Sequence, residues 1–425
     1  MARVVRSGSE TLLPRRVSPE YQNEKTLLSR EAHKPSVKKV AIYLDTLQGY
    51  GADRVLVKIA NGLANRGIQV DFVLARKSNK ADQDLHPAIQ MFGLQSSRLN
   101  VAKNVFGLTR YLRIHQPDVL FSSIHFNNVT ATTALMLSGV KSKLVVRQAN
   151  TLRYQLKSYR FPIGLALLFC TRMAYKRADL IVSQSKGMSR DIKSFMKADA
   201  KKVHLIYNPT VTPSIFEQAQ QPTNHAWFDQ RSAPVILAGG RLKSQKDFTT
   251  LIQAFAKVKQ HVLDARLVIL GEGPQRQELE DLVVQLNIAD SVDLAGFQKN
   301  PYAFIAMTDV FVLSSQYEGL PNILIEALAL GKKIVATDCE SGPAEILKYG
   351  KYGKLVPTGD PDQLADAIMD SLEEPLACFR KPQAIEDFNQ DSQVEKYIEV
   401  FSHLLEQQEV FKAQPSRLKT RLAPH

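Results

Sequence analysis

Two glutamates stand eight positions apart in the stretch YEGLPNILIEALALG, residues 317–331. Glu318 follows an apolar run typical of a buried strand, and Glu326 lies inside an apolar helical pattern. A buried carboxylate is costly unless a partner binds it. Carboxylate oxygens accept hydrogen bonds from sugar and ribose hydroxyls, so one ligand could reach both glutamates. The alternative is that Glu326 pairs with a lysine where two helices meet.

The segment between the two glutamates predicts a tight turn into a helix. Pro321 suits the first position of that helix, and Gly319 and Leu320 form the turn before it. Backbone N–H groups at the start of a helix bind anions. The N–H groups of Gly319, Leu320 and Asn322 are therefore candidates to bind a phosphate oxygen.

Two further loops carry residues suited to phosphates. In GGRLKSQKDF, Arg241 and Lys246 follow a predicted strand and could converge on a diphosphate; the alternative is an ordinary solvated loop. In LQGYGADRVL, Gly49 and Gly51 would let the backbone approach a ligand closely, unless they only form a tight turn. The G-x-G-x-x-G fingerprint is absent, so a dinucleotide site is not predicted.

Polar residues follow other predicted strands. His125, Asn127 and Asn128 in FSSIHFNNVT are placed for substrate contact, although a locally hydrogen-bonded histidine explains the pattern equally well. In CESGPAEIL, we interpret Glu345 as part of a turn and helix cap. The sequence has no P-loop, no H-E-x-x-H and no paired C-x-x-C. It therefore indicates no metal ligands.

These residues need an alternating α/β framework to position them. Strand patterns occur at 38–45, 69–75, 118–123, 143–148, 179–185 and 203–209, and again at 234–240, 265–272, 292–297, 309–315 and 333–338. Helical patterns at 51–67, 247–259, 274–286 and 321–330 lie between them. Continuous apolar strands alternating with helices are typical of parallel sheets covered on both faces. The sequence predicts two doubly wound, Rossmann-like domains facing across a cleft, where ligands bind at strand ends.

The domain boundaries follow from changes in composition. We predict a disordered basic extension at 1–37, an N-terminal domain at 38–212 and a linker at 213–233. A C-terminal domain at 234–385, a closing helix at 386–412 and a basic tail at 413–425 complete the chain.

The charge of the chain is uneven. Residues 1–215 hold 34 Lys and Arg against 13 Asp and Glu, whereas residues 216–425 hold 21 against 29. A basic half suggests that one half faces a polyanion, such as nucleic acid, an anionic membrane or a phosphorylated substrate. The three scattered cysteines are expected to be reduced thiols of a cytoplasmic protein. No signal peptide and no membrane-spanning run are predicted.

Taken together and in order, these motifs resemble glycosyltransferase family 4, the retaining enzymes of the GT-B fold. The family's E-x7-E motif is matched by Glu318 and Glu326, and its Gly-Arg…Gln-Lys element by GGRLKSQKDF. Its N-terminal glycine loop and helix are matched by GYGADRVLVKIANGLANRG. The strand ARLVILGEGP and the turn TDCESGPAEIL are also similar, and the resemblance covers about residues 38–375.

The resemblance implies a role for each matched residue. The N-terminal domain would bind the acceptor and the C-terminal domain the nucleotide sugar. Arg241 and Lys246 would hold the diphosphate, Glu326 the ribose, and Glu318 the transferred sugar near the reacting carbon. Gly49 and Gly51 would lie against the phosphates. Leu320 and Asn322 would offer backbone N–H groups. His125, or else Asn127 or Asn128, would contact the donor sugar. Such enzymes need no metal or cofactor and use no protein nucleophile, because the acceptor attacks the front face of the donor.

The basic N-terminal half then belongs to acceptor recognition. Residues 153–177 mix cations with an apolar centre, as in a helix that lies on an anionic membrane; the alternative is a buried helix. With the family's precedent we expect a cytoplasmic enzyme, peripheral on the inner face of a bacterial membrane. Its acceptor would be a glycan or a lipid-linked sugar of surface polysaccharide or lipopolysaccharide synthesis, and its donor a UDP-hexose or UDP-N-acetylhexosamine.

Three other functions remain open. The alternatives are a nucleotide-sugar epimerase of the same fold, a non-catalytic sugar-binding scaffold and a nucleic-acid-binding protein. The E-x7-E motif argues against the epimerase, and the presence of both glutamates, Arg241 and Lys246 argues against the scaffold. No nucleic-acid-binding motif is present, so nucleic acid is not expected as a partner.

Overall fold

The computed structural model describes residues 36–413, apart from 48–50, 77–84, 95–99, 152, 154–162, 231 and 376–381. The predicted basic extension and tail therefore fall almost wholly outside the described residues. So do Gly49 and part of the predicted membrane helix.

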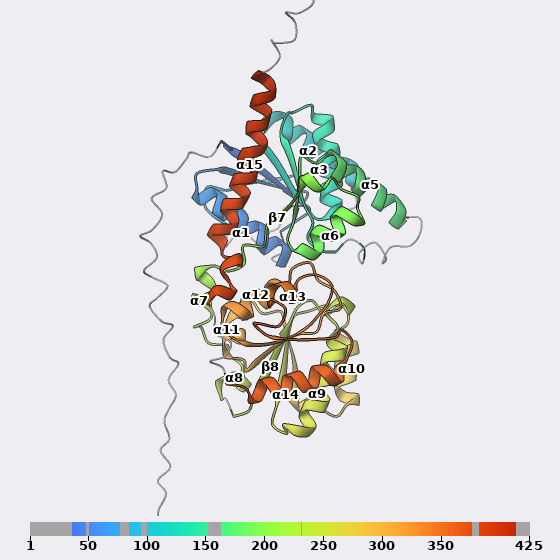
Figure 1. The fold of residues 1–425 in the computed structure, drawn as a ribbon, viewed down its shortest axis with the longest axis vertical. Helices are drawn as coiled ribbons and strands as arrows, with labels where there is room; N and C mark the ends of the chain where they lie inside the picture. Colours follow the sequence, from blue (N-terminus) through green and yellow to red (C-terminus); the bar gives the residue numbers. More distant parts are fainter. Residues whose placement is uncertain are drawn as a thin grey trace, which may run out of the picture. The chain divides into compact units, whose positions relative to one another are not determined.

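The N-terminal domain is built on a seven-stranded parallel sheet with the order β3-β2-β1-β4-β5-β6-β7 (Figure 1). Its strands are β1 Lys39–Leu44, β2 Gln69–Leu74, β3 Gln90–Gly93, β4 Val119–Ser123, β5 Lys143–Arg147, β6 Leu180–Ser183 and β7 Val203–Leu205. Its main helices are α1 Gly51–Asn65, α2 Val101–His115, α3 His125–Ser138, α5 Ile163–Arg177 and α6 Lys186–Ser194. Strands β1 and β4 are buried almost throughout, as the continuous apolar patterns predict.

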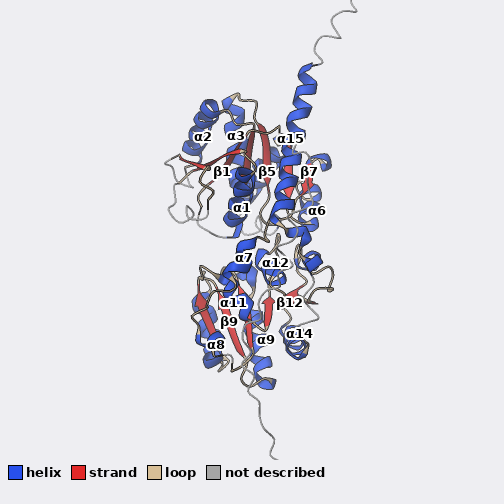
Figure 2. Ribbon diagram, turned by 90° about the vertical axis from the view of Figure 1, so that its left-hand side faces the viewer, coloured by secondary structure: helices blue, strands red, loops and turns tan. Residues whose placement is uncertain are grey.

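The C-terminal domain has a six-stranded parallel sheet with the order β10-β9-β8-β11-β12-β13. Its strands are β8 Val235–Gly239, β9 Arg266–Leu270, β10 Val292–Gly296, β11 Val310–Leu313, β12 Lys333–Thr337 and β13 Lys354–Val356. Its helices include α9 Phe248–His261, α10 Arg276–Gln285, α11 Pro301–Met307, α12 Asn322–Ala329, α13 Pro343–Ile346 and α14 Pro361–Glu373. Helices cover the strands in both views, so the predicted α/β class with two Rossmann-like domains is confirmed (Figure 2).

Each sheet reverses its strand order once, between β1 and β4 in the first and between β8 and β11 in the second. Ligands of open α/β sheets bind outside the carboxyl ends of strands at such switch points. The four loops that carry the predicted site residues follow β1, β4, β8 and β11. The topology therefore brings the residues singled out by the sequence to the two favoured positions for ligand binding.

Four short elements were not predicted. Strands β3 and β13 extend the two sheets, and the predicted linker at 213–233 contains helices α7 Pro213–Gln218 and α8 Ala226–Asp229. Helix α8 is held to the C-terminal sheet, because His225 Nε2 lies 2.8 Å from Asp293 Oδ2 and the Arg266 guanidinium lies over the Trp227 ring.

The predicted closing helix, α15 Gln390–Ala413, returns to the N-terminal domain. Its residues Val394, Tyr397 and Phe401 are buried in the same hydrophobic core as helix α1 and strand β4. Figure 1 shows α15 running beside α1, although the two are far apart in the sequence. The last helix of the chain thus completes the first domain.

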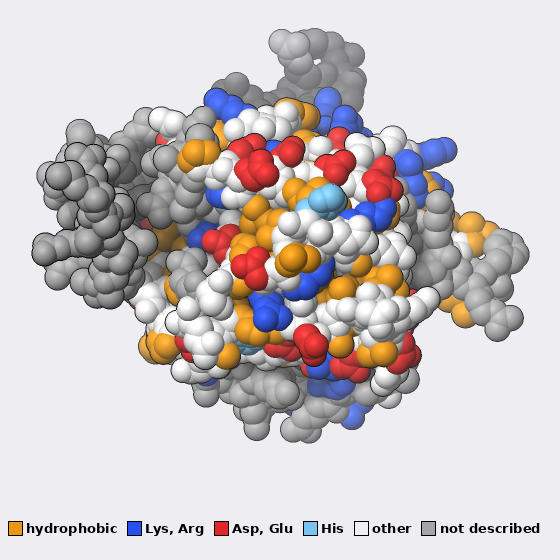
Figure 3. All heavy atoms as spheres, turned by 90° about the horizontal axis from the view of Figure 1, so that it is seen from below, with side chains coloured by type: hydrophobic (Ala, Val, Ile, Leu, Met, Phe, Trp, Pro, Cys, Tyr) orange, Lys and Arg blue, Asp and Glu red, His pale blue; other side chains and the backbone are white. Residues whose placement is uncertain are grey.

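The surface of the N-terminal domain over α2, α3 and α5 combines apolar and basic side chains. Helix α3 packs against both other helices. The exposed large apolar residues there are Val101, Phe106, Ile114, Met136, Leu137, Ile163, Leu165, Phe169 and Met173. The exposed basic residues are Lys103, Arg110, Arg113, Lys176 and Arg177. The end of the C-terminal domain seen in Figure 3 differs, because acidic side chains lie among its basic and apolar ones.

Candidate active site

Glu318 follows strand β11 and is held in place from several sides. Its Oε1 atom accepts hydrogen bonds from Lys246 Nζ at 2.5 Å and from Ser315 Oγ at 2.7 Å. Gln245 Nε2 lies 3.4 Å from the other carboxylate oxygen, and the residue is only 7% exposed. These partners explain how a carboxylate can be buried here, and they fix its orientation.

Lys246 belongs to a cluster of three cations on the loop after β8. Burial lowers the pKa of Lys243, and the charges of Lys246 and Arg241 lower it further, whereas Glu318 raises it. Arg241 is exposed. Three cations repel one another unless an anion joins them, so the loop can bind a diphosphate. The sequence identified Arg241 and Lys246 but missed Lys243 and the ion pair of Lys246 with Glu318.

The turn after Glu318 is shaped by the N-terminal domain. A Cβ atom at Gly319 would lie 2.8 Å from Ala149 O and 3.1 Å from Gln184 Nε2, so only glycine fits. Leu320 is 6% exposed and packs in the C-terminal core. The prediction that Pro321 begins the helix is wrong by one residue, because Pro321 is the N-cap and α12 begins at Asn322. An N-cap proline has no side-chain acceptor to cap the first turn. The Leu324 N–H bonds to the Pro321 carbonyl at 3.1 Å, so the N–H groups of Asn322 and Ile323 are the ones suited to a ligand.

Glu326 lies one turn into α12 and is 7% exposed. Its Oε1 accepts a hydrogen bond from the Tyr302 hydroxyl at 3.3 Å. Among the described residues no lysine forms an ion pair with it, so the alternative of a direct glutamate–lysine pair is not observed. Its carboxylate therefore has acceptor capacity left for hydroxyl groups.

Gly51 is the first residue of α1, and its carbonyl accepts a hydrogen bond from Asn322 Nδ2 at 3.4 Å. A Cβ atom at Gly51 would meet only ordinary contacts, the nearest at 3.8 Å. The protein fold alone therefore does not require glycine at this position. That the backbone here lies against a ligand stays a prediction.

Asn322 is linked to a buried arginine that the sequence did not single out. Arg147, at the end of β5, is 1% exposed and donates hydrogen bonds to Ser123, Gln184 and Asn208. Asn208 Nδ2 in turn donates to Asn322 Oδ1 at 2.7 Å. Burial lowers the pKa of Arg147. This chain of hydrogen bonds connects the N-terminal sheet to the first residue of α12.

His125 is the first residue of α3, at the carboxyl end of β4, and it is 4% exposed. It follows the fourth strand of the chain and not the third, because β3 was missed. The residue before it, Ile124, has a φ of 76°, an unusual conformation for a β-branched residue. The side chains of Asn127 and Asn128 bond to the backbone of Ser123 and Arg147. Contact of His125, or else of Asn127 or Asn128, with a donor sugar stays a prediction.

Glu345 contacts the other domain, which the interpretation as a local turn and cap did not foresee. Its two carboxylate oxygens accept hydrogen bonds from the backbone N–H of Lys186, at 2.8 and 3.2 Å. The Tyr207 hydroxyl donates to the same carboxylate at 2.5 Å. Burial raises the pKa of Tyr207, and the contact with Glu345 raises it further. Lys186 begins α6, so Glu345 stabilises the N-terminus of that helix.

Similar contacts join the carboxyl ends of the two sheets elsewhere. Thr151 Oγ1, after β5, donates to the carbonyl of Glu318 at 2.9 Å. Asn150 Nδ2 lies 3.4 Å from Gln245 Oε1. The structure therefore holds the loop that follows β5 directly against the turn between the two glutamates.

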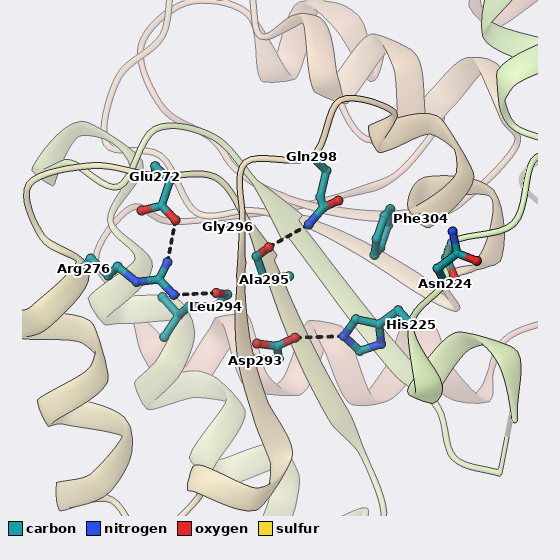
Figure 4. Close-up of a pocket in the computed structure, with 11 residues that line it drawn as sticks. Asn224, His225, Glu272, Arg276, Asp293, Leu294, Ala295, Gly296, Gln298 and Phe304 are labelled. Atoms are coloured by element: carbon teal, nitrogen blue, oxygen red, sulfur yellow. Dashed lines mark hydrogen bonds and ion pairs between the residues drawn. The ribbon is translucent and has the colours of Figure 1, made fainter.

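A hollow of about 670 Å³ lies on the C-terminal domain at the carboxyl ends of β9 and β10 (Figure 4). Several of its polar side chains bond to one another or to the backbone: Arg276 to Glu272 and to Leu294 O, and His225 to Asp293. None of the residues predicted for the active site lines it.

The two parallel sheets, with a cation cluster and two buried carboxylates at their strand ends, define a two-domain glycosyltransferase. Residues 50–212 match the model of glycosyltransferase family 4, and residues 224–393 match the model of group 1 glycosyl transferases. The chain belongs to this family of glycosyltransferases, as the sequence motifs indicated.

Two curated relatives are bacterial transferases. The chain is 30% identical, over 80% of its length and 91% of the relative, to the N-acetylgalactosamine-N,N'-diacetylbacillosaminyl-diphospho-undecaprenol 4-alpha-N-acetylgalactosaminyltransferase of Campylobacter jejuni. It is 28% identical, over 75% of its length and 84% of the relative, to the lipopolysaccharide core biosynthesis glycosyltransferase LpsE of Rhizobium meliloti.

Solved structures share the fold at lower identity. HepE from Anabaena, solved in complex with UDP-glucose, is 19% identical with a TM-score of 0.67, covering 88% of this chain and 99% of HepE. WaaG, a glycosyltransferase involved in lipopolysaccharide biosynthesis, is 16% identical with a TM-score of 0.66, covering 85% of this chain and 99% of WaaG. No helix within the described ranges is long and apolar enough to cross a membrane.

Proposed function

We propose that this glycosyltransferase transfers a sugar from a UDP-hexose or UDP-N-acetylhexosamine to a glycan or lipid-linked acceptor, with retention of the anomeric configuration. The observation that carries the proposal is the arrangement at the ends of β8 and β11. The loop after β8 carries three cations suited to a diphosphate, and one of them, Lys246, pairs with Glu318. Glu326 lies one helical turn beyond the start of α12.

Each part of the donor would bind to a different one of these groups. Arg241 and Lys246 bind the diphosphate and stabilise the charge that develops on it when the sugar leaves. The first turn of α12 offers N–H groups to the same phosphates, and Glu326 accepts hydrogen bonds from the ribose. The donor thereby lies along α12, with its sugar end toward Glu318.

Glu318 is suited to orienting the transferred sugar and not to attacking it. Its carboxylate is already bonded to Lys246 and Ser315, and each hydrogen bond reduces the nucleophilicity of the oxygen that accepts it. We therefore assign no protein nucleophile. The acceptor hydroxyl attacks from the side that the leaving phosphate vacates, and that phosphate takes its proton. His125 contacts the donor sugar, and no metal or cofactor takes part.

The surface over α2, α3 and α5 supports an acceptor held at a membrane. Between residues 101 and 177 the sequence has twelve Lys and Arg and one acidic residue, Asp118. Exposed apolar side chains among exposed cations are suited to a bilayer that carries anionic lipids. The relative from Campylobacter jejuni is named for an undecaprenol-linked acceptor. We infer a peripheral enzyme on the cytoplasmic face of the membrane, acting in surface polysaccharide or lipopolysaccharide synthesis.

Transfer from labelled UDP-sugars to a bacterial lipid extract tests this proposal. The wild-type protein should label a lipid or glycan, and NMR of the product should show the anomeric configuration of the donor. Arg241→Ala should reduce transfer about a hundredfold or more, because it removes a charge that stabilises the leaving diphosphate. The exposed Lys351 serves for the control variant Lys351→Ala, which should transfer normally. Full transfer by both Arg241→Ala and Glu326→Ala would overturn the site assignment, and an inverted product would overturn retention.

A further inference from the structure

Lys58 on α1 is a partly buried lysine at the contact between the two domains. Its ammonium donates a hydrogen bond to the carbonyl of Thr210 at 2.6 Å. Arg54, one turn earlier on the same helix, donates to the carbonyl of Lys299 at 3.2 Å. One face of α1 therefore reaches both the segment that connects the domains and the loop after β10.

The same contact places Lys58 beside α12. Thr210, which accepts the hydrogen bond from Lys58, uses its hydroxyl to donate to Asn322 Oδ1 at 3.2 Å. Asn322 lies one helical turn before Glu326, on the same face of α12. Burial lowers the pKa of Lys58, while the negative charge of Glu326 raises it. The ammonium and the carboxylate thus interact electrostatically across the contact between the domains.

The two charges nevertheless do not bond to each other. In the part of the chain that the structure describes, no ion pair joins Lys58 and Glu326. The bond to Thr210 uses one of the three N–H groups of the ammonium, and the Tyr302 hydroxyl occupies one acceptor site of the carboxylate. A partly buried cation and a buried anion that retain hydrogen-bonding capacity are suited to a neutral ligand with hydroxyl groups between them.

We propose that Lys58 is a second ligand of the donor ribose, opposite Glu326. A ribose hydroxyl would donate its hydrogen to the Glu326 carboxylate and accept a hydrogen bond from the Lys58 ammonium. This inference rests on the proposed function and extends it, because it assigns a donor-binding residue to α1 of the acceptor-binding domain. The bound nucleotide would then join the two domains, and the affinity for ribose would depend on both.

Binding of UDP, 2′-deoxy-UDP and 3′-deoxy-UDP, measured by calorimetry on the full-length chain, tests this proposal. The wild-type protein should bind UDP about tenfold more tightly than at least one deoxy form, because a hydrogen bond to a charged group is lost. Lys58→Met should weaken UDP binding by about tenfold and reduce the preference for UDP over that deoxy form by about fivefold or more. Glu326→Gln should reduce the same preference.

The matched control is Lys332→Met. Lys332 is a buried lysine that, like Lys58, donates to a backbone carbonyl, that of Ala306 at 2.7 Å, but it follows the other end of α12. This variant should keep the preference for UDP over the deoxy forms whatever its effect on stability. Lys58→Gln, which keeps a donor for Thr210, replaces Lys58→Met if the latter does not fold.

Two other outcomes are possible, and each overturns either the role of Lys58 or the proposed function. If the Lys58 variants bind all three nucleotides as the wild type does, or weaken them equally, Lys58 does not contact the ribose and has a structural role only. If the wild-type protein binds no UDP, GDP or ADP, the proposed function fails first. The two failures are therefore distinguishable.

Discussion

The contact between Lys246 and Glu318 is the most informative one at the residue scale. Both side chains are largely buried, with 14% and 9% of their surface exposed. A buried pair adds little net stability, but the loss of one partner leaves an uncompensated charge. A donor diphosphate can take over part of the bonding to Lys246 without leaving Glu318 unsupported, because Ser315 also binds it.

We expect Lys246→Met to lower the free energy of unfolding by about 3 kcal/mol, because Glu318 loses its counter-charge. The double variant Lys246→Met/Glu318→Gln should regain most of that loss and remain inactive in transfer. Chemical denaturation of the three proteins measures this.

The control for this prediction is Lys257→Met. Lys257 pairs with Asp362 on the surface, where both side chains are well exposed, so its loss should cost less than about 1 kcal/mol. An equal, small effect of Lys246→Met and Lys257→Met would contradict the assigned role of the buried pair.

The sequence identified the main residues of the site, but it did not identify the residues that contact them. Glu318, Glu326, Arg241 and Lys246 stand out because their types and spacing fit one ligand. Lys58, Arg147 and Lys243 do not stand out, because their importance arises from burial and from contacts with residues far away in the sequence. Periodicity within one helix contains no information on such partners.

At the scale of elements, Glu345 on α13 stabilises the N-terminus of α6 in the other domain. We expect Glu345→Gln to lower the free energy of unfolding by about 1–2 kcal/mol, because it removes the charge that meets the N-terminal N–H groups. Thermal unfolding of the variant and the wild type measures the change.

Glu373→Gln, at an exposed position on α14, provides the control and should unfold as the wild type does. Equal melting temperatures for the two variants would show that the contact between α13 and α6 contributes nothing to stability.

Long elements were predicted well and short ones were not. The buried strands β1, β4, β8 and β11 are continuous apolar runs, and the glycine and proline signals around them are clear. Strand β13, with the sequence KLV, and β3, with QMFG, are too short to show a period. The helices α7 and α8 lie in a segment rich in Pro, Gln and Asn, whose composition favours a linker. Their formation depends on packing against the C-terminal domain.

At the scale of the whole molecule, the face over α2, α3 and α5 should bind anionic membranes. The wild-type protein should sediment with vesicles of phosphatidylglycerol and phosphatidylethanolamine, and less with rising salt. Arg110→Glu/Phe169→Ser should weaken this binding about tenfold or more, because one cation and one large apolar side chain are lost from the face.

Leu263→Ser/Lys351→Glu makes the corresponding change at exposed positions of the C-terminal domain. It should leave vesicle binding unchanged. Equal binding to neutral and anionic vesicles, or equal losses in the two double variants, would contradict the membrane assignment.

The central claim is that the loops after β8 and β11 bind a nucleoside diphosphate without a metal. The most direct measurement is calorimetric binding of UDP, GDP and ADP to the purified protein in the presence of a chelator. The account predicts clear binding of UDP in preference to the other two, and about a tenfold or greater loss of affinity in Glu326→Gln. Binding that requires a divalent cation would contradict the metal-free site, and no binding of any of the three nucleotides would contradict the proposed donor class.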